Sequence, residues 1–264
     1  MKIHHLRNAT FIIESKDQFI LVDPMLGAKG SLPPFAFIRH KPRRNPLVPL
    51  PGNAADLLKK VTRCLVTHCQ KWGIEPLTHT DHLDRPGRDF LRKNNIPVIC
   101  LQRDRHYLEK KGIRTEAGLE YWKPASFPGG QVTAVPARHG HGWNHRLMAN
   151  GCGFFLRIPD EPGIYICGDT VLTPQVNRAL AEFKPDICVV AAGAARMDLG
   201  GPILMPLDEV MTLIENAPGK VIANHMDALN HCPVSRAVLA EKLTKKNLAA
   251  NTYIPADGQT LILD

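Results

Sequence analysis

Residues 67–84 read THCQKWGIEPLTHTDHLD, and they follow the short apolar run Cys64-Leu65-Val66. These 18 residues contain three histidines and two aspartates, and His79 and His82 lie on either side of Asp81. Neutral imidazole is the commonest protein ligand for metals, and together with carboxylate it suits zinc or manganese. A buried strand that leads directly into this polar stretch therefore predicts a metal-binding loop.

Strands and helices alternate along the rest of the chain after a β-rich start. Apolar residues between turn-forming residues predict short strands at 2–6, 10–14 and 18–23. Further strands are predicted at 63–67, 97–101, 117–122, 131–136, 153–158, 163–167, 187–191, 221–224 and 260–263, and helices at 54–61, 85–95, 103–111, 174–183, 207–216 and 234–246. This order favours an α/β sandwich, and without a convincing linker we expect one domain spanning 1–264.

Residues 25–53 form the exception to this alternation. They contain six prolines, at 33, 34, 42, 46, 49 and 51, and no helical or strand period survives that density. A loop of this length in a compact domain is usually a functional lid or a disordered segment. Phe35, Phe37 and Ile38 supply apolar anchors, which favours a packed loop that forms the wall of a pocket.

The net charge of +8 and the pI of about 9.2 suit an anionic partner. No acidic residue occurs between Asp23 and Asp56, although the interval is rich in basic ones. Guanidinium offers a planar fork of donors, so Arg39, Arg43 and Arg44 could clamp a phosphate or carboxylate of the substrate. The alternative is a solvated charged face. Nucleic acid is not favoured, because there is no basic helix and no aromatic-interleaved RNA motif.

The sequence predicts a cytoplasmic protein. No apolar run approaches the ~20 residues that a membrane span requires, and the N-terminus lacks the pattern of a secretory signal. The seven cysteines form no CxxC pair, and four of them lie in apolar runs, which favours buried free thiols in a reducing compartment. Whether the chain forms a homo-oligomer stays open.

Polar residues with metal-binding chemistry follow four predicted strands. These are His68, His139, Asp169 and His225. In a layered α/β fold, residues at strand ends can converge on one edge of a sheet. A lone histidine more often has another role, but four such residues together with the cluster at 79–82 predict a joint site. A two-metal site needs several nitrogen and oxygen ligands and a bridging group.

Other polar residues are weaker candidates. His141 and His145 lie in a glycine-containing loop and could contact substrate, or they could simply be solvated. His231 precedes the last predicted helix and could act as a leaving-group acid, as a partner of a ligand, or only structurally. Asp84 and Asp227 could accept the second ring N–H of a metal-bound histidine, or they could be surface carboxylates.

Taken together, the motifs resemble the metallo-β-lactamase superfamily over nearly the whole chain. They are the strand meander ending in Asp23-Pro24, the run His79-Thr80-Asp81-His82, Pro136-x-x-His139, Cys167-Gly168-Asp169-Thr170 and the late His225. Within the superfamily the chain is most similar to the branch that includes ascorbate-6-phosphate lactonase. The resemblance implies a four-layer αββα sandwich of the α/β class.

The resemblance also implies a site for two divalent metal ions, either zinc or manganese, with iron compatible as well. One ion would be held by His68, His79 and His139. The other would be held by Asp81, His82 and His225, with Asp169 bridging the two.

The spacing of the metal loop departs from the family pattern His-x-His-x-Asp-His. Ten residues, 69–78, lie between His68 and His79, and the position two before His79 is Leu77, which cannot bind a metal. Either 69–78 bulges outward and His68 is still a ligand, or the first site lacks one histidine. We favour the bulge, because a longer surface loop adds little closure entropy.

These observations predict a metal-dependent hydrolase that acts on a small anionic substrate, such as a lactone or a phosphorylated compound, with no membrane partner. Metal ions would make hydroxide available near neutral pH and polarise the scissile group, and Asp81 and His231 are the predicted catalytic residues. The alternatives are a phosphodiesterase or nuclease of the same fold, and a non-catalytic ligand-binding protein with a degraded metal site.

Overall fold

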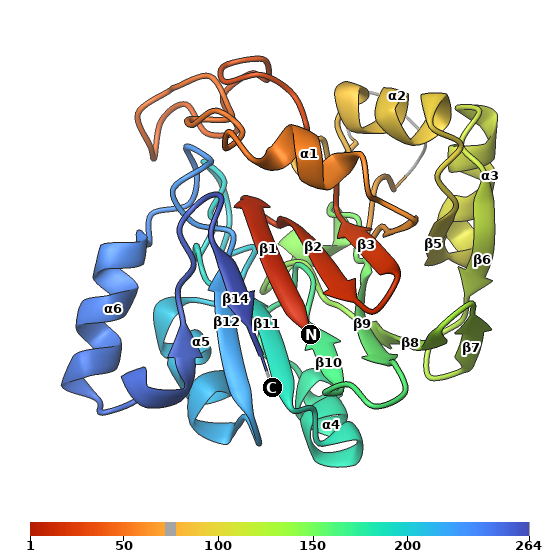
Figure 1. The fold of residues 1–264 in the computed structure, drawn as a ribbon. Coiled ribbons are helices and arrows are strands. Elements are labelled where there is room, and N and C mark those ends of the chain that lie inside the picture. The colour runs from red at the N-terminus through yellow and green to blue at the C-terminus, as the bar shows by residue number, and fades with distance from the viewer. Residues whose placement is uncertain (72–77, 264) are drawn as a thin grey trace.

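The computed structural model describes residues 1–71 and 78–263, and it consists of two mixed β-sheets with helices on their outer faces (Figure 1). The first sheet has seven strands in the order β14-β1-β2-β3-β4-β5-β6. Its strands are β1 (Lys2–Arg7), β2 (Thr10–Ser15), β3 (Gln18–Val22), β4 (Arg63–Leu65), β5 (Val98–Leu101), β6 (Thr115–Leu119) and β14 (Thr260–Ile262). The meander β1-β2-β3 is antiparallel, whereas β3 to β6 run parallel to one another.

The second sheet also has seven strands, in the order β13-β12-β11-β10-β9-β8-β7. These are β7 (Pro124–Phe127), β8 (Gly130–Pro136), β9 (Cys152–Arg157), β10 (Ile164–Ile166), β11 (Ile187–Ala191), β12 (Lys220–Asn224) and β13 (Thr252–Tyr253). Strands β10 to β13 are parallel, and β7 to β10 are antiparallel.

Three apolar cores hold four layers together. The core between the sheets joins side chains of both, for example Ile13 of β2 and Phe154 of β9. The helices α1 (Ala54–Leu58), α2 (Arg85–Lys93) and α3 (Gln102–Lys110) pack on the first sheet. The helices α4 (Pro174–Phe183), α5 (Leu207–Asn216) and α6 (Arg236–Lys245) pack on the second. The predicted αββα sandwich is therefore confirmed.

Most element boundaries agree with the sequence to within one or two residues, since caps and apolar runs are local signals. Thr173, for example, caps α4 by accepting a hydrogen bond from Val176 N, and Pro174 follows it in the first turn. The sequence did not predict β7 and β13. Both are short edge strands, and β7 begins with a proline, which is tolerated at an edge. The described residues also contain two short 3-10 helices, Asn144–Arg146 and Ala249–Asn251.

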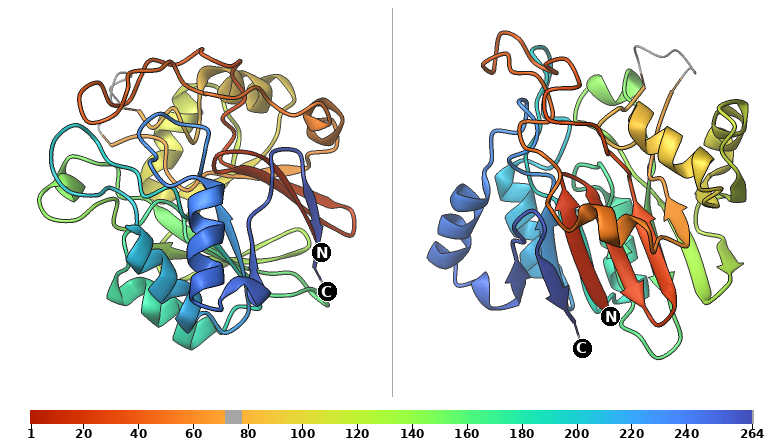
Figure 2. Two further views of the ribbon diagram at one scale, coloured as in Figure 1. Left: turned by 90° about the vertical axis from the view of Figure 1, so that its left-hand side faces the viewer. Right: turned by 45° about the horizontal axis from the view of Figure 1, so that its top comes forward.

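The long segment 25–53 contains neither helix nor strand and passes over one end of the sandwich (Figure 2). Leu32 and Asn45 exchange two backbone hydrogen bonds, and Leu47 N donates to Ala228 O. Leu32 and Phe35 pack beside a small apolar cluster that includes Leu229. These contacts attach the loop to the segment that follows β12.

The structure shows that His68 lies beside His79 despite the ten residues between them. His79 N donates to Cys69 O over 3.1 Å, so the chain returns after residue 69 and brings His79 next to His68. The predicted outward bulge falls largely on residues 72–77, which lie outside the described residues. Within residues 1–71 and 78–263, no helix is both long and apolar enough to cross a membrane.

Candidate metal centre

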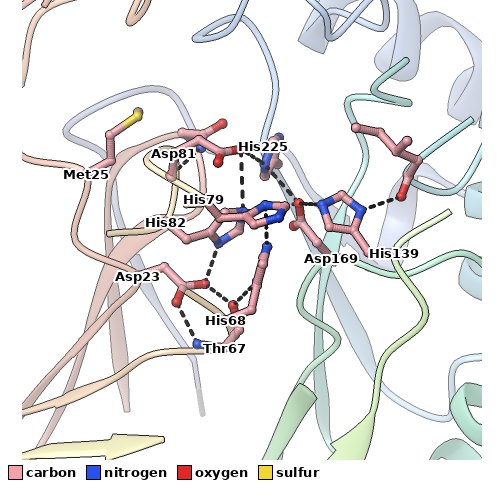
Figure 3. Close-up of polar contacts among 12 residues, drawn as sticks. Asp23, Met25, Thr67, His68, His79, Asp81, His82, His139, Asp169 and His225 are labelled. Atoms are coloured by element: carbon pink, nitrogen blue, oxygen red, sulfur yellow. Dashed lines mark hydrogen bonds and ion pairs between the residues drawn. The ribbon is translucent and has the colours of Figure 1, made fainter. Parts of the chain in front are cut away.

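Seven histidine and aspartate side chains meet at one end of the sandwich (Figure 3). His68, His139 and Asp169 lie three residues after the ends of β4, β8 and β10, and His225 directly follows β12. The two sheets therefore deliver ligands from both sides of the interface between them. His79, Asp81 and His82 come from the turn before α2.

The first cluster consists of His68, His79 and His139, whose ligand atoms lie within 4.8 Å of one another. His68 Nε2 is 3.2 Å from His79 Nδ1, and the ring centroids of His79 and His139 are 5.1 Å apart. His68 is buried, with 1% of its surface exposed. The structure thus retains three imidazoles in this cluster despite the ten-residue spacing.

The second cluster consists of Asp81, His82, Asp169 and His225. Asp169 Oδ2 lies 3.1 Å from His82 Nε2 and 3.6 Å from His225 Nε2. The same oxygen is 3.5 Å from His139 Nε2 of the first cluster. Asp169 of the second cluster therefore also approaches the first, and its role as a bridging ligand stays a prediction.

The residues present fit a pair of divalent ions. The Nε2 atoms of His82 and His225 and Oδ1 of Asp169 are buried and have no hydrogen-bond partner among the described residues. Buried polar atoms are nearly always paired, so these three atoms, all from residues of the second cluster, need a further partner. The donor set of imidazole and carboxylate suits zinc, manganese or iron.

Burial holds the first cluster in its metal-binding form. Desolvation, helped by the neighbouring imidazoles, lowers the pKa of His68 well below its usual range and lowers the pKa of His79 to about 3. Burial also lowers the pKa of His139. Neutral imidazole is the ligand form, so no proton has to be displaced from this cluster when metal binds.

In the second cluster, His82 and Asp169 are ionised instead. Burial opposes a charge on His82, but the carboxylates of Asp169, Asp23 and Asp81 outweigh it and raise the pKa of the ring well above its usual range. Burial likewise opposes ionisation of Asp169, yet His82 and His225 hold its pKa well below the usual range. A metal ion must therefore displace the proton of His82 here.

Hydrogen bonds from outside the clusters orient the ligands. Asp23 Oδ2 accepts from His82 Nδ1 over 2.8 Å and from Thr67 Oγ1 over 2.7 Å. His68 Nδ1 in turn donates to Thr67 Oγ1, and His139 Nδ1 donates to Ile203 O over 2.8 Å. Each of these contacts leaves Nε2 directed at the site.

The acceptors suggested by the sequence serve elsewhere. Asp84 caps α2 and accepts backbone N–H groups of the 25–53 loop, while Asp227 accepts from Arg236. In their place stand Asp23 and Cys232, whose Sγ is 3.6 Å from His225 Nδ1. Asp23 had a detectable signal, because it follows a strand that would lie beside the strand leading to His68.

An apolar cleft of about 610 Å³ opens over His79, Asp81 and His139. The proline-rich loop 25–53 contributes Leu32, Pro33, Pro34, Phe35 and Phe37 to the lining, and the other apolar lining residues are Leu147, Met148, Met197 and Ile203. His231 also lines the cleft and is only 3% exposed. Its ring packs edge-on against Phe35, with centroids 5.2 Å apart.

The arginines suggested as an anion clamp do not line this cleft. Arg39 Nη1 donates to Gly200 O over 3.2 Å, and Arg44 Nε donates to Gly30 O over 2.7 Å. Arg43 borders a separate hollow on the surface. Their predicted role in substrate binding therefore has no support from their positions.

The two loop histidines also lie outside the lining of the cleft. His141 Nε2 pairs with Glu209 Oε1 over 2.5 Å, and His145 Nδ1 donates to Gly142 O over 2.7 Å. Both rings have partners within the protein, so contact with substrate stays a prediction for them.

Comparison with known proteins agrees with this geometry. The family described as beta-lactamase superfamily domain matches residues 18–226. The UPF0173 protein YddR of Bacillus subtilis is 30% identical over 263 residues, covering 98% of this chain and 99% of that protein. A UPF0173 metal-dependent hydrolase of Koribacter versatilis is 24% identical over 73% of this chain and 72% of its own length.

Among solved structures, the isothiocyanate hydrolase from Delia radicum gut bacteria superposes with a TM-score of 0.87. It is 30% identical, and the match covers 100% of this chain and 99% of that one. The chain therefore belongs to the metallo-β-lactamase superfamily and, within it, to the UPF0173 family of metal-dependent hydrolases.

Proposed function

We propose that this hydrolase acts on a small, uncharged electrophile that carries an apolar substituent, and that organic isothiocyanates are the best-supported class. The observation that carries the proposal is the apolar cleft above the metal centre. Most of its lining is aliphatic, aromatic or proline, and such walls bind an apolar group by removing it from water. The similarity to a solved isothiocyanate hydrolase over the full chain supports the same class.

A phosphorylated substrate fits this cleft less well. A phosphate group placed against Phe35 or Leu147 would lose its hydration without gaining a cationic partner, because the arginines of the loop lie outside the lining. This argues against a substrate like ascorbate 6-phosphate and against a polynucleotide. A neutral lactone with an apolar tail fits the same walls and is the second candidate.

The reaction on an isothiocyanate consumes one water and yields an amine and carbonyl sulfide. A carbon–oxygen bond forms, the carbon–nitrogen bond breaks, and the nitrogen gains two protons. Divalent ions held by the two clusters would supply Lewis acidity and lower the pKa of water at this site. The chain itself orients the ligands through Asp23 and Thr67, and it excludes water with the walls of the cleft.

His231 is the proposed proton carrier. It lines the cleft, and its Nδ1 is buried without a hydrogen-bond partner among the described residues. Burial lowers the pKa of His231 to about 4, so the ring is neutral at pH 7. A neutral imidazole can accept a proton from the attacking water and return it to the departing nitrogen. Asp81, exposed to the same cleft, is proposed to position the water.

A substrate panel tests the proposal. Metal-loaded protein is assayed with benzyl isothiocyanate, an apolar lactone, a 6-phosphorylated lactone and a phosphodiester, with Asp169→Asn as the metal-site control. We expect benzylamine to appear with the wild type alone. Turnover of the phosphodiester without turnover of the isothiocyanate would favour the phosphodiesterase alternative, and inactivity on all four would favour a ligand-binding protein.

The role of His231 has a separate test. We expect His231→Gln to lower kcat by about a hundredfold, as is typical for loss of a general acid or base, with KM and metal content unchanged. The matched control is His106→Gln, since His106 is an exposed histidine on α3. Equal kcat values for wild type and His231→Gln would contradict a proton-transfer role.

A further inference from the structure

Basic residues of the 25–53 loop that do not line the substrate cleft border a second hollow, with a volume of about 350 Å³. Its lining includes three basic side chains, His40, Lys41 and Arg43, together with Asp227, Asn230 and Cys232. No residue is shared with the lining of the substrate cleft. The segment after β12 separates the two, because His231 lines the cleft while Asn230 and Cys232 line the hollow.

Positive charge in this hollow is not balanced from within. Lys41 and Arg43 have no side-chain partner among the residues that the structure describes, and both are exposed to solvent. The Nε2 atom of His40 likewise has none there. The one acidic lining residue is Asp227, whose Oδ2 is taken by the backbone N and Nη1 of Arg236. The hollow therefore presents three basic side chains against one carboxylate, and that carboxylate is already paired with Arg236.

The backbone that carries these donors is held in place. Asn230 Nδ2 donates to Ala36 O over 2.7 Å and to Lys41 O over 3.3 Å, while its Oδ1 accepts from Phe35 N and from Asn45 Nδ2. The Asn230 side chain thus ties Ala36, Lys41 and Asn45 of the loop to the segment after β12. Donors on a fixed frame lose less conformational freedom when they bind a ligand.

We propose that this hollow is an accessory binding site for a small oxyanion, namely phosphate or the phosphoryl group of a small metabolite. Lysine and arginine side chains bind such groups by charge-assisted hydrogen bonds, and guanidinium does so with two parallel donors. The proposal accounts for the basic residues of the 25–53 loop independently of the reaction in the cleft. It also places an anion beside Cys232, which contacts the metal ligand His225.

The test is calorimetric titration of the metal-loaded protein with inorganic phosphate. We expect one saturable binding event that weakens about tenfold in the double variant Lys41→Gln/Arg43→Gln, because two charge-assisted hydrogen bonds are lost. The control is Arg44→Gln, which removes a positive charge from the same loop but lies outside the lining and should change the affinity less than twofold. If the double variant does not fold, the phosphate affinities of the single variants Lys41→Gln and Arg43→Gln are compared with that of Arg44→Gln instead.

Three results would overturn the proposal. The first is absence of saturable phosphate binding to the wild type. The second is an unchanged phosphate affinity in the Lys41 and Arg43 variants, which would assign phosphate to the metal centre. The third is an equal loss of affinity in Arg44→Gln, which would indicate an effect of net charge alone. Parallel titration with glycerol 3-phosphate distinguishes the sources. Binding as tight as that of phosphate supports a phosphorylated metabolite, and much weaker binding supports the free ion.

Discussion

Asp23 accepts hydrogen bonds from two residues that position the metal centre, Thr67 and His82. We expect Asp23→Ala to reduce metal affinity by about 10- to 100-fold, as is usual when the partner of a ligating histidine is lost. Competition with a chromogenic chelator measures this affinity. Asp17→Ala, at an exposed aspartate in the turn before β3, should leave it unchanged. Equal affinities for wild type and Asp23→Ala would show that His82 needs no orienting carboxylate.

Asp104 lies buried on α3, outside the metal centre, and accepts a hydrogen bond from Gln70. Burial raises its pKa from 3.8 to about 6. The folded protein therefore holds this proton more tightly than the unfolded chain does. The contribution of Asp104 to the free energy of unfolding is fully present below pH 3.8 and is lost as pH rises through the folded-state pKa of about 6.

Asp104→Asn removes this pH dependence while keeping an oxygen for Gln70. We expect the variant to be more stable than the wild type at pH 7, by on the order of 2 kcal/mol, and the difference to shrink toward pH ~4. Urea unfolding across this range measures it, with Asp160→Asn, at an 86% exposed side chain, as the control. A difference that does not vary with pH would contradict the buried, protonated carboxyl.

The segments around the metal centre contribute apolar side chains to the lining of the cleft. Leu147 follows the 3-10 helix Asn144–Arg146 and lines the cleft, whereas Leu199 is 75% exposed and does not. We expect Leu147→Ala to raise KM for benzyl isothiocyanate about fivefold, because less apolar surface is buried on binding, and to have little effect on methyl isothiocyanate. Leu199→Ala should change neither. An equal rise of KM for both substrates would contradict an apolar wall that selects the substituent.

Local sequence signals predicted most of these elements. Apolar runs and capping residues such as Thr173 act within a few residues, so helices and strands follow from them with small boundary errors. The edge strands β7 and β13 lack such runs and are made by pairing with a neighbouring strand, which a local pattern does not encode. The wall formed by residues 25–53 could be expected from its prolines and aromatic anchors, although its partners could not.

On the scale of the whole molecule, the two sheets meet at a cluster of buried ionisable groups. Asp169 Oδ1 and the Nε2 atoms of His82 and His225 need a further partner, which metal ions can provide. A free metal concentration of ~1,000 times the dissociation constant adds about 4 kcal/mol to the free energy of unfolding. We expect chelation to lower Tm by about 10 °C, given ~2–4 °C per kcal/mol for a chain of this size. Differential scanning calorimetry measures the shift.

The control for chelation is the variant His79→Ala/Asp169→Asn, which loses a ligand from each cluster. Its Tm should not respond to the chelator. A wild-type Tm that is the same with and without the chelator would contradict stabilisation by metal.

The sequence by itself determined the layered fold and predicted the side chains of the candidate metal centre. Both follow from local patterns, namely alternating apolar strands and helices, and polar residues soon after strands, as with His139 and Asp169, which each lie three residues after a strand end. Tertiary structure decided the rest. The contact between Cys69 O and His79 N brings His79 beside His68, the parallel pairing of β3 with β4 brings Asp23 to His82, and Asn230 ties the backbone at Lys41 to the segment after β12. Cys69 and His79 are ten residues apart, whereas Lys41 and Asn230 are 189 apart. Contacts at such separations leave no periodic signal in the sequence.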